Sequence, residues 1–362
     1  MQIAIAERLK GFVHRPGVRA LIPGSSLVAE AYPARLEFYD LGESTPCGEV
    51  ALTLEGAGEH FTLEQDLERG HLKIFSSFGR KLFRVSLSAC EGGVLLLVDK
   101  LPYPMAFQSR WRGVEANGAL AIGEPVRFGA PLGEPLNFST LLGERLSFGS
   151  SKALNWDCVS GREEMREILP YWFRLGGMAP SLSSAKIPSS TLLSSLDAAI
   201  AERRRSDLIP SLRNLYRAGF GELMVPSCVD EHHLGFSLPP LSKESSPLLL
   251  LSAGAQLIRS ILIDERDGAL SLLPLLPHDL PCGRLIRAAT SFGELDMEWS
   301  CGRMRRCFLN PTLSTELLLD LPKEIRHFRV RYLPHGSGRK VDAGTPFPVF
   351  QGRRVFIDRF EK

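Results

Sequence analysis

The sequence predicts an α+β multidomain protein with an N-terminal β-sandwich, an α-helical middle and a C-terminal antiparallel β-domain. Short alternating or apolar runs separated by glycine and proline fill residues 1–135, which is typical of a sandwich. Longer segments with apolar residues at helical spacing follow within residues 136–264, and short alternating runs return within residues 265–362. A chain of 362 residues is long enough to form two or three domains, each with its own core.

Period-two patterning predicts the strands of the first region. Residues 35–40 alternate between the two faces of a strand, as a half-buried strand does. Residues 94–98 are continuously apolar, which favours a strand in the middle of a sheet. A stretch rich in glycine and proline, residues 123–143, separates this region from the helices.

End signals and apolar periodicity predict the helices of the middle region. Ser160 followed by Glu163 forms a capping-box pattern, so we expect a helix that begins at Ser160 and ends at Gly176. Residues 191–204 and 207–218 have apolar stripes and a short connection, which predicts an αα-hairpin.

A further helix and a series of strands are predicted toward the C-terminus. Residues 253–263 carry an apolar stripe at helical spacing. Residues 269–276 are almost wholly apolar but include Pro274 and precede Pro277, which favours an edge strand. Residues 294–299 alternate strictly, as in a half-buried antiparallel strand. Four more runs have strand character: residues 285–289, 303–309, 326–332 and 353–357.

Composition argues against several classes of partner. The formal net charge is +2 and the charged fraction is 23%, so we expect no nucleic-acid partner. The longest apolar run falls far short of the ~20 residues that a membrane span needs, so we expect no membrane partner. Seven cysteines without a CxxC pair, and no signal-peptide pattern, favour reduced thiols in the cytoplasm. With no P-loop, dinucleotide fingerprint or zinc-finger spacing, we expect no cofactor and no metal.

An ordered series of motifs gives the sequence a resemblance to a known family. The helix at residues 253–263 is followed by a short acidic turn, a Leu-Leu-Pro strand at residues 272–277, a proline-bounded linker, and a strand pair that runs from Gly293 through Trp299 to Arg303. This order resembles the end of the catalytic toroid and the start of the C-terminal β-domain in family 95 glycoside hydrolases, the α-L-fucosidase A-like proteins of bacteria. It covers about a sixth of the chain.

The resemblance implies a β-sandwich, a six-hairpin α/α toroid and a C-terminal β-domain, with a glycan or small saccharide as the partner. The family has an Asp-Gly-Asn cluster before the glycine-rich helix, whereas this chain has leucines at residues 248–250. No catalytic residue of the family is therefore carried over. The toroid needs about a dozen helices, and the middle region has room for about four to six, so a shortened toroid is expected. The resemblance leaves two alternatives, a diverged glycosidase or glycan-binding protein, and a catalytically inactive scaffold.

A group of polar residues in a predicted loop is the candidate site. Asp230 and Glu231 offer carboxylates, and we expect one of them to serve in catalysis, with His232 and His233 binding the substrate. The adjacent histidines lack the i, i+4 spacing of a helical zinc site, so no metal is predicted there. A polar surface loop with no function is the alternative.

Glycoside hydrolysis requires a second carboxyl group across the glycosidic bond, about 5–9.5 Å from the first. Asp157 is the candidate catalytic partner, and the neighbouring Trp156 is predicted to bind substrate by stacking on a sugar ring. Glu64 and Asp66 in the first region are alternative partners. Glu163, Glu164 and Glu167 are interpreted as acids in the first turns of a helix.

Overall fold

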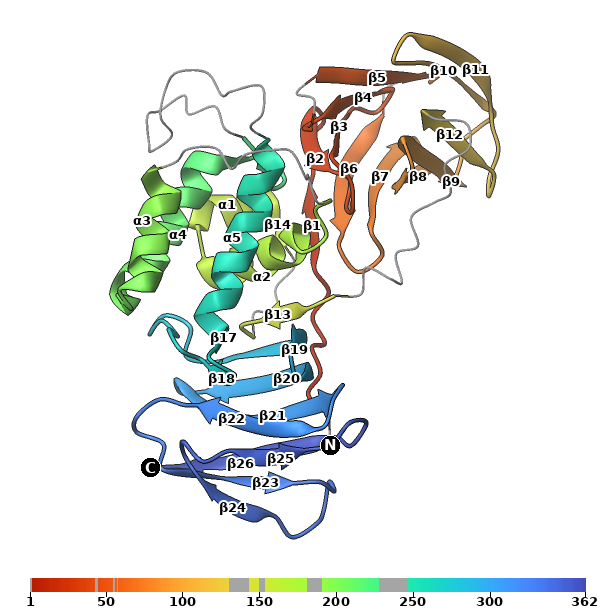
Figure 1. Ribbon diagram of the computed structural model, residues 1–362. Helices are drawn as coiled ribbons and strands as arrows, with labels where there is room; N and C mark the ends of the chain where they lie inside the picture. The colour runs from red at the N-terminus through yellow and green to blue at the C-terminus, as the bar shows by residue number, and fades with distance from the viewer. Residues whose placement is uncertain are drawn as a thin grey trace.

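The structure, a computed structural model, describes residues 2–42, 45–54, 56, 58–129, 143–149, 154–180, 191–227 and 246–362. Strands make up 47% of it, and five helices occur in the described residues. The fold is therefore β-rich with several sheets, as expected. Figure 1 shows the first sheets, the helices and the last sheets as three neighbouring bodies.

Two sheets form the first body. The seven-stranded sheet has the order β12-β9-β8-β7-β6-β1-β14, and the six-stranded sheet has the order β11-β10-β5-β4-β3-β2. The first sheet contains β1 (Lys10–Val13), β6 (Glu59–Asp66), β7 (His71–Phe78), β8 (Lys81–Cys90), β9 (Gly93–Lys100), β12 (Pro125–Gly129) and β14 (Leu154–Asn155). The second contains β2 (Val18–Leu21), β3 (Leu27–Ala31), β4 (Arg35–Asp40), β5 (Thr45–Leu52), β10 (Met105–Trp111) and β11 (Val114–Leu120).

The sequence patterns account for the strands of this body. Leu36 and Phe38 in β4 are buried, whereas the alternate residues Arg35 and Glu37 are partly or fully exposed, so the period-two prediction is confirmed. The apolar run in β9 pairs with β8 on one side and β12 on the other, so it lies inside the sheet as predicted.

Helices form the middle body: α1 (Trp156–Arg162), α2 (Met165–Gly176), α3 (Thr191–Ala201), α4 (Arg205–Gly219) and α5 (Pro247–Leu262). The pair α3 and α4 packs together, which confirms the predicted hairpin. Two short strands, β15 (Phe220–Gly221) and β16 (Val225–Pro226), follow α4. The helix α5 packs on α2 and begins earlier than predicted, with Ser246 as its N-cap.

The helix start predicted at Ser160 is wrong. Ser160 lies inside α1, where its hydroxyl donates to the carbonyl of Trp156 at 2.8 Å instead of capping a helix. Glu163 has a left-handed φ of 51° and ends α1. The next residue, Glu164, caps α2 by accepting a hydrogen bond from the backbone N–H of Arg166 at 3.4 Å.

The last body has two sheets. The larger one has the order β13-β19-β20-β21-β26-β23-β24 and the smaller one β17-β18-β22-β25. The larger sheet contains β13 (Arg145–Ser147), β19 (Gly283–Thr290), β20 (Gly293–Ser300), β21 (Arg303–Pro311), β23 (His327–Arg331), β24 (Arg339–Asp342) and β26 (Val355–Glu361). The smaller sheet contains β17 (Ile263–Arg266), β18 (Ala269–Leu272), β22 (Thr315–Asp320) and β25 (Phe347–Val349).

The edge-strand prediction for residues 269–276 is wrong. The strand β18 pairs with β17 on one side and β22 on the other, so it lies within its sheet. Pro274 and Pro277 follow the strand and leave its hydrogen bonds intact.

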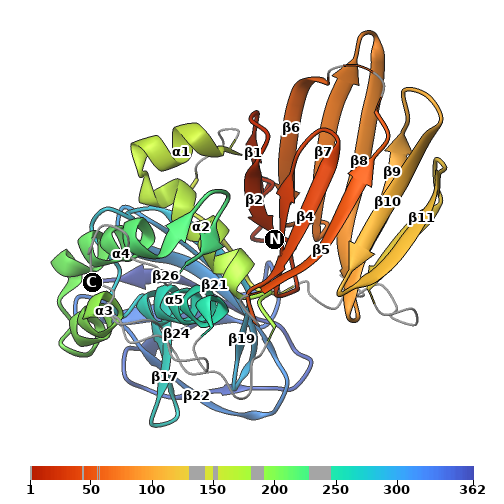
Figure 2. The same cartoon turned by 90° about the horizontal axis from the view of Figure 1, so that it is seen from above.

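Three segments connect the bodies. β14 adds to the first sheet by pairing in parallel with β1, whereas β13 adds to the last body by pairing with β19. Residues 2–9 extend from β1 to the last body, where Ile3 is buried beside Phe308 and Phe356. Figure 2 shows the helices and last sheets on one side of the first strands and the sandwich on the other. Among the described residues, no helix has both the length and the apolar character needed to cross a membrane.

Candidate functional site

The predicted loop site lies outside the described residues. This concerns Asp230, Glu231, His232 and His233. Their pairing with a distant acid therefore stays a prediction.

The other two predicted site residues lie at the start of α1 and differ in exposure. Trp156 is 2% exposed, and its ring centroid lies 4.8 Å from that of Tyr171 in the core. A sugar ring cannot stack on this indole while it packs there. Asp157 is exposed and forms an ion pair with Arg15 at 3.1 Å. The two side chains thus do not face one common cavity in the described structure.

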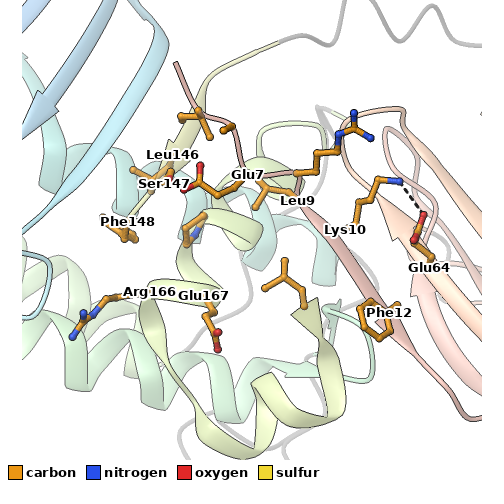
Figure 3. A pocket seen from close by; sticks show the side chains of 15 residues that line it. Glu7, Leu9, Lys10, Phe12, Glu64, Leu146, Ser147, Phe148, Arg166 and Glu167 are labelled. Carbon is orange, nitrogen blue, oxygen red and sulfur yellow. Dashed lines mark hydrogen bonds and ion pairs between the residues drawn. The ribbon is translucent and has the colours of Figure 1, made fainter. Parts of the chain in front are cut away.

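A pocket of about 500 Å³ lies where the three bodies meet. Its walls are the segment that leads into β1, the strand β6, residues 146–148 around the end of β13, and the first turns of α2. Figure 3 shows Lys10 and Glu64 on one side, and Arg166 and Glu167 from α2 on another. Of the candidate acids named from the sequence, Glu64 lines this pocket.

Lys10 bridges two carboxylates at one side of the pocket. Its ammonium group lies 3.1 Å from Glu64 and 2.6 Å from the fully buried Asp66. Burial acts to lower the pKa of Lys10, but the hydrogen bonds and charges of the two acids outweigh it and raise this pKa. Burial acts to raise the pKa of Asp66, but Lys10 and two backbone N–H groups outweigh it and hold this pKa below its usual range.

The wall behind this ion-pair group is held together by buried hydrogen bonds. Gln65 is fully buried; its amide donates to the carbonyl of Leu21 and it accepts a hydrogen bond from the Tyr171 hydroxyl. Gly11 passes directly over that hydroxyl, because a Cβ at this position would lie 2.8 Å from the Tyr171 oxygen. These contacts fix β1 and β6 against α2, so the charged groups in front of them are held in place.

A second ion pair lies on the helical side. Glu167 is 4% exposed and lies 2.7 Å from the Arg162 guanidinium, while Arg166 beside it is exposed. Glu167 lies in the first turn of α2, as the sequence indicates, and it also lines the pocket. Two aromatic side chains, Phe12 and Phe148, add apolar surface to the lining. Residues from five elements, β1, β6, β13, β14 and α2, thus form one polar and aromatic cavity.

No family model matches the chain, and no curated protein is similar enough to count as a match. Within the described ranges, histidine, cysteine and carboxylate side chains form no group that could hold a metal ion.

Proposed function

We propose that this protein binds a small saccharide in the pocket between β1, β13 and α2. The observation that carries the proposal is the lining: about 500 Å³ of space with the Glu64 carboxylate, the Lys10 ammonium and the Phe12 ring in one wall. Sugars offer hydroxyl groups to charged acceptors and donors and an apolar C–H face to aromatic rings. The order of sandwich, helices and β-domain, with the motifs of residues 253–303, adds support through its resemblance to family 95 glycoside hydrolases.

The pocket supports binding better than hydrolysis. A glycosidase needs one carboxyl group that carries a proton for the leaving oxygen and a second that acts as base or nucleophile. Glu64 and Glu167 each already contact a cation, Lys10 and Arg162 respectively, and such carboxylates act as hydrogen-bond acceptors. A diverged glycosidase that uses Asp230 or Glu231 stays as the catalytic form of the proposal.

The proposal is tested by calorimetric titration of the whole chain with L-fucose, D-galactose and their methyl glycosides. We expect saturable binding of at least one sugar, and Glu64→Gln should weaken it by about tenfold or more, because a charge-assisted hydrogen bond contributes roughly 1.5–3 kcal/mol. The matched control is Glu115→Gln on the exposed strand β11, which should bind like the wild type. Equal loss in both variants would contradict the assignment of this pocket.

Hydrolysis is measured in parallel with aryl glycosides. We expect no release of the aryl group by the wild type. Release that disappears in the double variant Asp230→Asn/Glu231→Gln would instead establish the diverged glycosidase and overturn the binding-only form.

The second candidate function is that of a catalytically inactive scaffold, and the packing of the helices favours it. The Trp172 indole N–H donates to the carbonyl of Leu251 at 3.0 Å, and a Cβ at Gly254 would lie 2.1 Å from the Trp172 ring. The space between α2 and α5, where a reduced toroid would need a cleft, is therefore filled. A chain that binds no sugar of the panel would support this second function.

A further inference from the structure

A second cavity, of about 810 Å³, lies at one end of the first body. Its lining comes mainly from strand ends, and both sheets contribute: β8, β9 and β12 from one sheet, and β3, β4, β10 and β11 from the other. None of its residues lines the pocket proposed for the saccharide. The two cavities are therefore separate.

The walls of this cavity are largely apolar. Leu27, Cys90 and Phe128 are buried in its lining. Burial raises the pKa of the Cys90 thiol, so this group is uncharged at neutral pH. Val114 also lines the cavity and is 71% exposed, which extends the apolar surface to the solvent. Such walls suit the apolar body of a small molecule.

One buried donor in the lining has no partner. Trp111 is 7% exposed, and its Nε1 atom has no hydrogen-bond partner among the described residues. Most buried N–H groups in folded proteins are paired, because an unpaired donor withdrawn from water is destabilising. The indole N–H thus lacks an acceptor that the described chain does not supply.

Packing turns the N–H of Trp111 away from β5. A Cβ at Gly48, its partner in β5, would lie 2.4 Å from Cε3 of the indole. In an indole, Nε1 lies on the edge of the ring opposite Cε3. The other neighbour of β10 is β11, where Val114 pairs with Trp111 and lines the cavity. The N–H edge therefore lies on the cavity side of the ring.

The charged side chains of the lining offer no buried charge in need of a counterion. Arg112 pairs with Asp40 at 3.3 Å, and Arg127 is exposed. Within the described part of the chain, none of these three side chains has a buried polar atom without a partner. The Ser109 hydroxyl donates to the carbonyl of Ala116 at 3.3 Å. An uncharged acceptor therefore suits this cavity better than an ion, which would lose its water.

We infer that this cavity binds a compact, uncharged apolar molecule with a carbonyl oxygen, a ketone, ester or amide, and that the Trp111 N–H donates to this oxygen. The apolar walls contact the body of the molecule, and the single donor fixes its orientation. The volume falls within the range of roughly 300–1,000 Å³ that is usual for small-molecule sites. The inference does not depend on saccharide binding, because the two cavities share no lining residue.

The test compares acetophenone with ethylbenzene, which has nearly the same shape but no carbonyl group, by calorimetric titration of the full chain. We expect the wild type to bind acetophenone about two- to tenfold more tightly, which is the effect of one neutral hydrogen bond. Trp111→Phe keeps an aromatic ring but removes the N–H, so it should bind the two probes equally. Benzoate should bind more weakly than acetophenone, because its charge loses water in the cavity.

Two exposed positions supply further variants at little cost in stability. Val114→Asp should weaken the binding of acetophenone by at least about threefold, and it serves if Trp111→Phe does not fold. The matched control is Ile122→Asp, at a position that is 62% exposed and outside the lining, which should bind like the wild type. The inference would be overturned by a wild type that binds no acetophenone or binds both probes equally. A preference for acetophenone that persists in Trp111→Phe, or tighter binding of benzoate, would also overturn it.

Discussion

His71, in β7, illustrates how burial of a single group links stability to pH. Burial lowers its pKa to about 4, with Asp66 opposing and Lys73, Arg69 and Lys10 adding to the effect. The folded chain thus keeps this imidazole neutral at a pH where the unfolded chain protonates it. The stability that comes from keeping His71 neutral is therefore complete above about pH 6.5. It is lost as the pH drops from about 6.5 to about 4.

We predict that His71→Gln removes most of this dependence. In the wild type, the free energy of unfolding should fall by about 1–3 kcal/mol between about pH 6.5 and about pH 4, after allowing for partial contact of the ring with solvent. Urea unfolding at pH 7, 5.5 and 4.5 measures it. His335→Gln, at an exposed position, is the control and should retain the wild-type slope. A slope that survives in His71→Gln would show that another group titrates in this window.

The sequence could indicate acids as candidates but not their surroundings. The sequence names Glu64 and Asp66 only as alternative acidic partners in the first region. Their shared contact with Lys10 depends on the pairing of β1 with β6, and Lys10 and Glu64 are 54 residues apart. Glu167 has the correct helical position, yet its burial arises from Arg162 and from strands packed over α2. Pairing across long sequence separations leaves no local pattern, so these environments could not be predicted from spacing.

At the scale of elements, close contact between α2 and α5 depends on the absence of a side chain at Gly254. A Cβ there would lie 2.1 Å from the Trp172 ring, whose indole is fixed by its bond to Leu251. We predict that Gly254→Ala lowers the free energy of unfolding by about 1–3 kcal/mol through overpacking. Chemical denaturation measures the loss.

The matched control is a glycine in a helix with open space around it. Gly161 in α1 has nothing within 4 Å of a Cβ position, so Gly161→Ala should stabilise the chain by about 0.5–1 kcal/mol. The two substitutions are chemically identical and should have opposite signs. If Gly254→Ala stabilised the chain as well, the packing of α2 on α5 would be looser than the contact implies.

Element types followed from the sequence better than element ends did. The alternation in β4 and the apolar stripes of α3 and α4 predicted both kinds of element, because burial of one face imposes a period. The capping pattern at Ser160 failed because a serine hydroxyl can equally bond to the carbonyl four residues earlier. The edge-strand prediction for β18 failed because Pro274 and Pro277 lie after the strand rather than within it.

At the scale of the whole molecule, the segment before β1 connects bodies that are distant in sequence. Backbone carbonyls of Ala4 and Glu7 accept hydrogen bonds from Arg284 and Arg145, and the backbone N–H of Leu9 lies 3.5 Å from Glu68. Its side chains alternate, so that Ile3 is buried and Ala4 is exposed. No sequence motif predicts this role, because its contacts are with residues far along the chain.

These two neighbouring positions allow a direct test of that connection. We predict that Ile3→Asp lowers the free energy of unfolding by about 2 kcal/mol, since it removes apolar burial beside Phe308 and Phe356 and places a carboxylate there. Ala4→Asp adds the same charge one residue away, where the side chain faces solvent, and should change stability by less than about 0.5 kcal/mol. Scanning calorimetry and limited proteolysis would measure both, and faster cleavage of residues 2–9 is expected only in Ile3→Asp. Equal effects at the two positions would mean that charge, rather than burial of Ile3, governs how this segment holds the last sheets to the first.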